Sequence, residues 1–244
     1  MAEKDRGQFR IGTSGYQYDH WKGDFYPEDL PRSQWLDFYM DHFDTVEINN
    51  SFYHLPSAET FRKWHDQAKP GFRYTLKFSR YGSHLKKLKD PDNSIGNFLE
   101  AAEHLKSYMG AILVQLPPNW GANVRRLAAF LDRAPRRHRW ALEFRDPDWL
   151  CEEVFEVMAE NNAALVVHDM IDDHPRRTTA DWVYLRYHGK DYSGNFSDEF
   201  LQGQAEIVQQ HLGQGRDVYA YFNNDIGGHA IRNARTLRRL TTGN

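Results

Sequence analysis

Short apolar runs rich in β-branched and aromatic residues recur along the chain, separated by segments of helix length. Runs of this kind predict buried strands where turn residues flank them. They predict strands at about 9–13, 44–49, 72–78, 110–116, 139–144, 164–168, 182–187 and 218–222.

Between these runs, apolar residues recur at the spacing of an amphipathic helix. The clearest sets are Trp35, Phe38, Tyr39 and His42; Phe98, Ala101, Ala102 and Leu105; Leu127, Phe130 and Leu131; and Val154, Phe155 and Met158. Strand–helix alternation without hairpin turns predicts parallel strands joined by helical crossovers. Because eight strands close a barrel with a packed interior, the pattern predicts an α/β fold, a (β/α)8 TIM-type barrel.

The barrel is expected as a single domain over residues 9–240, with flexible tails at 1–8 and 241–244. No linker, low-complexity tract or longer repeat interrupts the 244-residue chain. An open doubly wound sheet is the alternative. Against it, the first strand leads into Gly12-Thr13-Ser14-Gly15, which is not a dinucleotide-binding GxGxxG fingerprint.

Polar side chains recur where the predicted strands end. Because side chains alternate along a strand, residues two apart share a face, and parity selects the groups that turn toward a barrel axis. The expected catalytic residues are Glu47, Glu143 and His188, and the expected ligand-binding residues are Ser14, Tyr16, Asn49, Lys77, Gln115, Arg145, Asp169, Arg186 and Asn223. Parity cannot decide between His168 and Asp169. Barrel ligand sites are built at the C-terminal ends of strands, so these groups predict a polar mouth there.

Composition narrows the setting. The net charge of -3 gives no global attraction to nucleic acid or an anionic membrane. No apolar run reaches the roughly 20 residues of a membrane helix, and the charged start Met1–Gln8 lacks the apolar core of a secretory signal. The simplest expectation is a cytoplasmic protein. The single cysteine, Cys151, is expected to be a small buried residue in an early helical turn.

Other features favour structural interpretations. Five tryptophans are expected to pack in the core: Trp21, Trp35, Trp64, Trp140 and Trp149. The basic run from Arg125 to Arg139 is expected to be a solvated helix face. Two long loops, Tyr16–Leu30 and Gly189–Phe196, are candidate lids over the mouth.

The motifs also resemble a known family. The opening Ile11–Tyr16, with Trp21-Lys22-Gly23 and Phe25-Tyr26-Pro27, is similar to that of the YecE-like family, the domain of unknown function numbered seventy-two. The similarity continues through Phe43–Asn49, Ser51-Phe52-Tyr53, Lys77-Phe78, Gln115–Pro118, Glu143-Phe144-Arg145 with Trp149, Arg186–Gly189 and Tyr221–Asn224. It covers about Phe9 to Leu240 in order. It implies a TIM-type barrel but no reaction, substrate or cofactor. The family pattern has an acidic residue where Asp169 stands, and His168 departs from it.

Three functions compete. The first is a binder or enzyme for an anionic, oxygen-rich ligand, phosphorylated or derived from nucleic acid, with phosphoester hydrolysis as its reaction. Lys77, Arg145 and Arg186 would hold the anion. The likeness to barrel nucleases is an analogy of fold only. The second is a glycosidase with Glu47 and Glu143 as its carboxylate pair. The third is a non-catalytic or regulatory barrel, in which Glu47–Lys77 and Glu143–Arg145 or Arg186 form a structural plug.

No cofactor is predicted, and the nature of any cofactor is left open. Glu47, Glu143, Asp169 and His188 are the side chains that would have to converge on a divalent ion, but the nearby cations would repel it. The expected partner is therefore a small-molecule or nucleic-acid-derived anion, with no membrane. The oligomeric state does not follow from the sequence.

Overall fold

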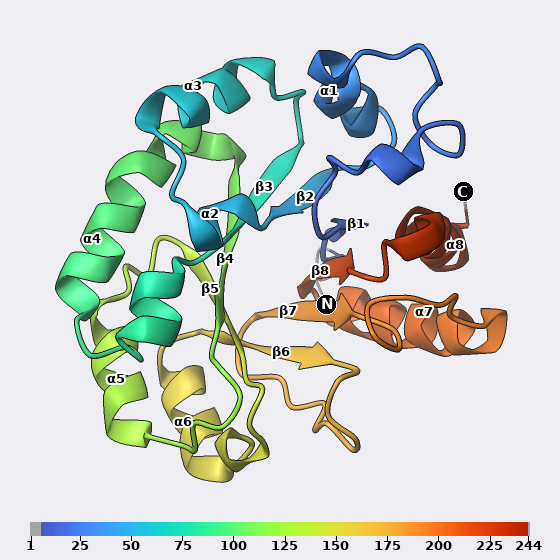
Figure 1. Ribbon diagram of the computed structural model, residues 1–244. Coiled ribbons are helices and arrows are strands. Elements are labelled where there is room, and N and C mark those ends of the chain that lie inside the picture. The colour runs from blue at the N-terminus through green and yellow to red at the C-terminus, as the bar shows by residue number, and fades with distance from the viewer. Residues whose placement is uncertain (1–5, 244) are drawn as a thin grey trace. The chain divides into compact units, whose positions relative to one another are not determined.

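The computed structural model describes residues 6–243, which form two compact units. Within the described residues, unit 1 comprises the part up to 46, 168–170 and the part from 182 onward, and unit 2 comprises 47–167 and 171–181. Strands and helices alternate along the chain, except that no helix separates the strands at 164–168 and 182–187. Every described strand pairing is parallel, as in the predicted (β/α)8 TIM-type barrel (Figure 1).

Unit 1 holds the strand order β1-β8-β7, formed by β1 (Phe9–Thr13), β8 (Asp217–Phe222) and β7 (Trp182–Tyr187). Its helices are α1 (Trp35–Met40), α7 (Asp198–Gly213) and α8 (His229–Thr242), with short 3-10 turns η1 (Asp19–Trp21), η2 (Arg32–Gln34) and η6 (Ile226–Gly228). β1 needs glycine at position 12, because a Cβ there would lie 2.0 Å from the carbonyl oxygen of Thr45.

Unit 2 holds the strand order β6-β5-β4-β3-β2, formed by β6 (Ala164–His168), β5 (Arg139–Glu143), β4 (Met109–Gln115), β3 (Arg73–Lys77) and β2 (Thr45–Ile48), although the unit boundary cuts the ends of β2 and β6. Figure 1 shows α4 (Pro91–Ala102) and α5 (Val124–Arg133) along one side of β4 and β5. The remaining elements are α2 (Asn50–Tyr53), α3 (Ala58–Gln67), the π-helical η3 (Tyr81–Leu85), η4 (Glu103–Tyr108), η5 (Pro147–Trp149) and α6 (Glu152–Glu160).

Every strand expected from the hydrophobic pattern is present within one residue of its predicted bounds. The helix predictions are confirmed for α5 and α6, whereas α1 ends before His42 and α4 ends before Leu105, which lies in η4. Half of the expected tails 1–8 and 241–244, namely residues 1–5 and 244, lies outside the described part. Within it, Gly7 donates to Leu212 O at 3.0 Å, and α8 continues to Thr242, so regular structure extends beyond 9–240.

Aromatic packing fixes much of the first long loop. Trp21 and Tyr26 are fully buried and Phe25 is 7% exposed. Tyr26 stacks on Trp35 with ring centroids 4.5 Å apart, and the Tyr26 hydroxyl donates to Tyr16 O at 2.6 Å. The expectation of a lid in this segment is therefore wrong for its aromatic residues, because they anchor the loop in the core.

The burial of five tryptophans and of Cys151 was also expected from the sequence. Four of the five selected tryptophans are buried, and Trp64 is partly exposed and stacks on Tyr74. The expectation of a buried Cys151 is wrong: it is the N-cap residue of α6 and is partly exposed. A cap position lies at the end of a helix, where fewer neighbours cover it than in the first full turn.

Candidate functional site

The candidate groups gather at the C-terminal ends of the strands in each unit. In unit 2, Gln115 and Glu143 end β4 and β5 and are register partners. The Gln115 amide nitrogen donates to Glu143 Oε1 at 2.9 Å, and Arg145 Nε donates to the same oxygen. Glu143 is fully buried, whereas the Arg145 side chain is 13% exposed. A buried carboxylate needs such partners, because an unpaired charge away from water is costly.

Lys77 occupies the end of β3 in the same unit. Its ammonium lies 4.4 Å from the centroid of the Phe52 ring, a cation–π distance. The Ser51 hydroxyl donates to Lys77 O at 2.7 Å, which ties the start of α2 to the end of β3. We call Lys77, Gln115, Glu143 and Arg145 the β3–β5 cluster.

The sequence interpretation missed His84, which lies in η3 directly after β3. Its ring packs edge-on against Phe52 at 4.9 Å between centroids. The pKa of His84 is lowered to about 4, mainly by burial and also by the charges of Lys77, Arg80 and Arg145, against an opposing effect of Glu143. His84 is therefore neutral at pH 7 and interacts electrostatically with three cations and one carboxylate.

The signal that could have revealed His84 is in the sequence. From Lys77 to Lys89 the chain carries Lys77, Arg80, Lys86, Lys87 and Lys89 and no acidic residue. A segment with that balance, placed directly after a strand, brings positive charge to the C-terminal end of the sheet.

Strand β2 supplies the two remaining unit 2 candidates. Glu47 is fully buried near the end of the strand, and Asn49 is the partly exposed N-cap residue of α2. Both therefore lie at or near the C-terminal end of β2, where the sequence interpretation expected them.

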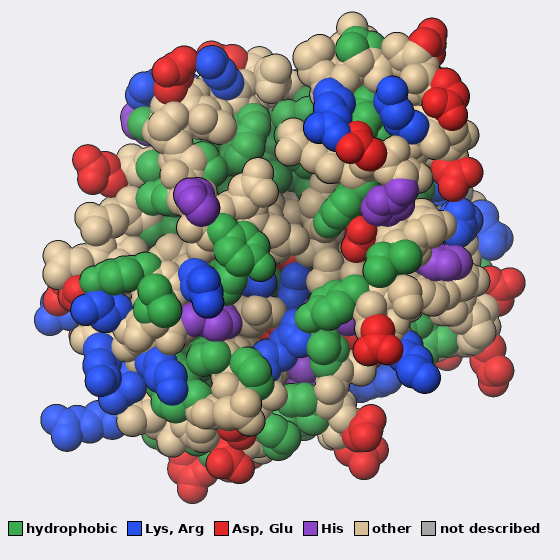
Figure 2. Space-filling view, viewed as in Figure 1, with side chains coloured by type: hydrophobic (Ala, Val, Ile, Leu, Met, Phe, Trp, Pro, Cys, Tyr) green, Lys and Arg blue, Asp and Glu red, His purple; other side chains and the backbone are tan. Residues whose placement is uncertain are grey.

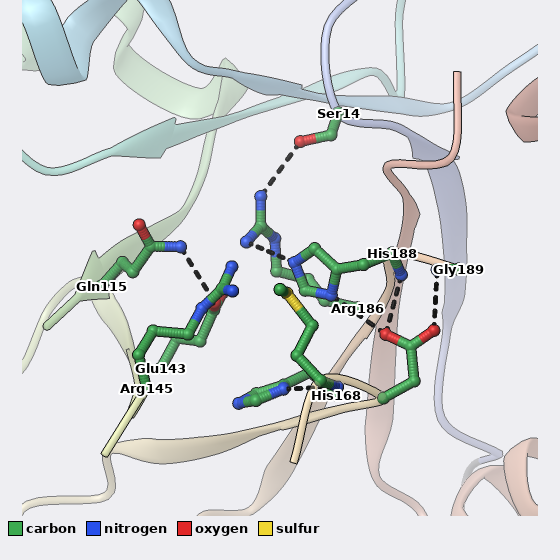
Figure 3. A network of polar contacts seen from close by, with 10 residues as sticks. Ser14, Gln115, Glu143, Arg145, His168, Arg186, His188 and Gly189 are labelled. Carbon is green, nitrogen blue, oxygen red and sulfur yellow. Dashed lines mark hydrogen bonds and ion pairs between the residues drawn. The ribbon is translucent and has the colours of Figure 1, made fainter. Parts of the chain in front are cut away.

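In unit 1, Asp169, Arg186, His188 and Ser14 form a second network, the β7 cluster (Figure 3). Arg186, 1% exposed, donates from Nη1 to His188 Nε2 at 3.1 Å and from Nη2 to Ser14 Oγ at 3.1 Å. The Asp169 carboxylate accepts from the backbone N–H groups of His188 and Gly189, both at 2.8 Å, and from His188 Nδ1 at 3.0 Å.

These contacts define the state of the His188 ring. A guanidinium only donates hydrogen bonds, so His188 Nε2 must accept from Arg186 and carries no proton. Nδ1 then carries the proton and donates to Asp169. Burial, the largest effect, raises the pKa of Asp169, but the hydrogen bonds from His188 and Gly189 outweigh it and leave that pKa below its ordinary value. The network holds one tautomer of a neutral His188.

Both residues left open by parity take part in this network. His168 is 4% exposed, its Nδ1 accepts from Met170 N at 3.2 Å, and its ring packs edge-on against His188 at 5.8 Å. Asp169 turns its carboxylate to His188 and Gly189. His168 therefore packs against the His188 ring, and Asp169 accepts the hydrogen bond from His188 Nδ1.

Two expected ligand-binding residues have other neighbours. Tyr16 packs against Tyr39 at 6.1 Å between centroids, and burial raises the pKa of Tyr16 to about 12, so its hydroxyl stays protonated. Asn223 is partly exposed, and its backbone N–H donates to Tyr187 O at 2.7 Å.

The buried amide in this region is the next residue, Asn224, which the sequence interpretation missed. Its Nδ2 donates to Gly194 O and to Asn233 Oδ1, both at 2.8 Å. These bonds tie the second candidate lid, Gly189–Phe196, to α8. Because β8 ends at Phe222, strand alternation does not decide between Asn223 and Asn224.

Within residues 6–243, no group of three or more His, Cys, Asp or Glu side chains is arranged to hold a metal ion. No helix in that part of the chain is both long and apolar enough to cross a membrane.

Comparisons with known proteins agree on the family. A sequence model of the family described as "Protein of unknown function DUF72" matches residues 10–244. The UPF0759 protein YecE of Escherichia coli (strain K12) is 32% identical over 120 residues, which are 48% of this chain and 43% of YecE. The UPF0759 protein YunF of Bacillus subtilis (strain 168) is 24% identical over 94% of this chain and 93% of its own length.

Among solved structures, a DUF72 family protein from Thermotoga maritima MSB8 matches with a TM-score of 0.82 and 26% identity. The alignment covers 96% of this chain and 98% of that chain. The fold of almost the whole chain is thus similar to that of a solved DUF72 family protein.

Proposed function

From the premise that this chain belongs to the DUF72 family, we propose that it binds a phosphorylated, oxygen-rich ligand through the cations at the C-terminal ends of β3 and β5. The observation that carries the proposal is the position of His84. Its pKa is lowered by burial and by the positive charges of Lys77, Arg80 and Arg145 together. These three cations therefore act on one place, although the chain as a whole is acidic.

Chemistry favours a phosphate at this place. A phosphate offers several acceptor oxygens and up to two negative charges, which match lysine and arginine donors. A neutral imidazole adds a donor that gains a proton more readily once an anion lies beside it. The amide of Gln115 at the end of β4 supplies a neutral group suited to the rest of the ligand.

Phosphoester hydrolysis is the reaction that we propose for this ligand, and the contacts rank the three candidate catalytic residues. Glu143 is the weakest base, because Gln115 and Arg145 both bind its Oε1. His188 accepts a proton only when Arg186 leaves Nε2. Glu47 is fully buried near the C-terminal end of β2, where a carboxylate is positioned to act as the general base.

The contacts of Glu143 also bear on the glycosidase and plug hypotheses. A glycosidase needs one of its two carboxyl groups protonated as the acid, and an Arg145 partner favours the ionised form of Glu143. The plug hypothesis predicted the Glu143–Arg145 pair that is present. The plug and the ligand site therefore differ in what an anion does to the protein.

The test is a titration of wild type with inorganic phosphate, nucleoside monophosphates and sugar phosphates, followed by thermal unfolding. Ligand that binds the native state raises the melting temperature by mass action. We expect stabilisation by phosphorylated compounds that is lost in Lys77→Gln. The matched control, Arg136→Gln, removes an exposed cation that lies before β5 and should keep the effect. Equal stabilisation of both variants would refute the proposed site.

Hydrolysis is tested separately, with p-nitrophenyl phosphate and bis-p-nitrophenyl phosphate as probes. Glu47→Gln should abolish turnover while phosphate still stabilises the protein. Turnover unchanged in this variant would remove Glu47 from the mechanism and leave the binding proposal standing.

A further inference from the structure

The segment after β3 continues beyond the β3–β5 cluster as a surface of alternating rings and cations. Tyr53, Tyr81 and Leu85 are the large hydrophobic side chains of unit 2 that are strongly exposed, at 69%, 48% and 66%. All three follow the C-terminal end of β2 or β3. Exposed large apolar side chains gathered in one region mark an interaction site.

Two rings of this surface, Tyr81 and Trp120, are accompanied by cations. Lys86 Nζ lies 5.3 Å from the Tyr81 ring centroid, and its neighbour Lys87 places Nζ 5.5 Å from the Trp120 ring. Arg126 lies 5.7 Å from the same Trp120 ring, and its Nη1 donates to Lys87 O at 3.3 Å. One ring–cation group in η3 and a second around Trp120 are therefore joined through the consecutive residues Lys86 and Lys87.

The other end of the surface joins the candidate phosphate site. Phe52 contacts Tyr53 edge-on at 4.9 Å, His84 at 4.9 Å and the Lys77 ammonium at 4.4 Å. Figure 2 shows basic, histidine and hydrophobic side chains intermixed over this part of the molecule. We call Tyr53, Tyr81, Lys86, Lys87, Trp120 and Arg126 the aromatic–basic strip.

We propose that the aromatic–basic strip binds single-stranded nucleic acid, with bases stacking on Tyr53 and Tyr81 and phosphates contacting Lys86, Lys87 and Arg126. Proteins that hold single strands without reading their sequence combine these two features, a basic track and exposed rings. A flat anionic membrane or a phosphopeptide would use the cations but would not need a row of open rings. The inference deepens the proposed function, on which it rests for the phosphate nearest Lys77.

Charge complementarity explains how an acidic protein could do this. The net charge of -3 is spread over the chain, whereas Lys77–Lys89 has five lysines and arginines and no carboxylate. Contacts within about 10 Å dominate at ordinary salt, because more distant charges are screened. A nucleic acid strand at the strip would therefore meet the local positive charge.

The experiment measures fluorescence anisotropy of a labelled oligothymidine of about twelve nucleotides, with the full chain, between about 50 and about 200 mM salt. The charge variant is Lys86→Gln/Lys87→Gln, and its matched control is Lys63→Gln/Arg136→Gln. The control removes the same charge from exposed positions outside the strip. We expect the strip variant to bind about tenfold more weakly and to lower the salt slope by about 1.4, and we expect the control to match wild type.

The ring variant is Tyr81→Leu, with Tyr81→Phe as its control. Loss of stacking should weaken oligothymidine binding by about tenfold in Tyr81→Leu, whereas Tyr81→Phe keeps the ring and the affinity. A duplex of the same length and inorganic polyphosphate should both compete poorly, since neither offers unstacked bases.

Equal competition by polyphosphate, or equal binding by Tyr81→Leu and Tyr81→Phe, would overturn the inference in favour of a general polyanion surface. Binding to vesicles containing anionic lipid but not to oligothymidine would overturn it in favour of a membrane. The failure is distinguishable from failure of the proposed function: Tyr81→Leu keeps Lys77 and Arg145, so phosphate should still raise its melting temperature.

Discussion

Replacing Glu143 by glutamine separates a ligand site from a structural plug. The substitution keeps the size of the side chain and an oxygen able to accept from Gln115 Nε2, now at 2.9 Å from Glu143 Oε1. It removes the charge that Arg145 pairs with. The two hypotheses agree that the unliganded protein loses stability and disagree about anion affinity.

The expected loss of stability follows from burial. Removing one partner of a buried ion pair costs about 3–5 kcal/mol, because the other charge is left uncompensated. The Arg145 side chain is 13% exposed and can gain some water, so we expect about 2–3 kcal/mol. For a chain of this size, each kcal/mol lowers the melting temperature by about 2–4 °C. The predicted decrease is therefore about 4–12 °C.

Anion binding should move in the opposite direction. In wild type, Glu143 competes with any incoming anion for Arg145. Without that carboxylate, phosphate should bind the variant more tightly, by about tenfold if the effective repulsion removed is near 1.4 kcal/mol. The pKa of His84 should also fall further, because Glu143 is the group that raises it.

The assay is calorimetric titration with phosphate, combined with thermal unfolding and NMR titration of the His84 ring. Lower stability with tighter phosphate binding supports the site. Lower stability with no phosphate binding in either protein is the result expected of a plug and would refute the reasoning.

Three further results are expected. Asp169→Asn should destabilise the protein by about 2–4 kcal/mol, because the native carboxylate accepts three hydrogen bonds; Asp172→Asn is the exposed control in urea unfolding. The pKa of Asp169 lies below its ordinary value, so its contribution is present above that ordinary value and lost as pH falls through the folded pKa; the difference between wild type and Asp169→Asn should therefore shrink in acid. A His84 pKa of about 4 means that the folded state binds fewer protons than the unfolded state from about pH 6.5 down to about 4. The free energy of unfolding should therefore decrease as the pH is lowered across that window. His84→Gln should reduce this pH dependence. Tyr26→Phe should cost about 1–3 kcal/mol by leaving Tyr16 O without its buried donor, seen as a lower urea midpoint.

The strands were predictable because their signal is local. A buried parallel strand is apolar on both faces, and each run stands out between polar loops. Parity then brought Gln115 and Glu143 together correctly, since both lie within strands whose register is fixed. The same reasoning proposed the Glu143–Arg145 pair, because Arg145 lies only two residues beyond Glu143.

Prediction weakened where the backbone leaves the strand. Asn223 was selected by extending β8 past Phe222, whereas Asn224 is the residue whose amide is buried against Gly194 and Asn233. Loop residues are positioned by tertiary hydrogen bonds, which have no sequence period. The tautomer of His188 could not be predicted from the sequence either, because it depends on the contacts of Arg186 and Asp169 with the two ring nitrogens.

The role of Arg145 follows from the same distinction between local and tertiary effects. Its sequence position suggested that Arg145 either pairs with a carboxylate or binds an anionic ligand. The structure shows the pair with Glu143, and that pair is compatible with anion binding. A side chain that neutralises buried Glu143 also contributes to the field that lowers the pKa of His84. If the cluster served stability alone, a positive field on a neutral histidine would only oppose folding in acid. A ligand that brings negative charge reverses that effect, because it stabilises Lys77, Arg145 and protonated His84 at once. Phosphate binding that strengthens as pH falls from about 7 to about 5 would therefore identify the cluster as a site, and binding independent of pH in that range would separate His84 from it.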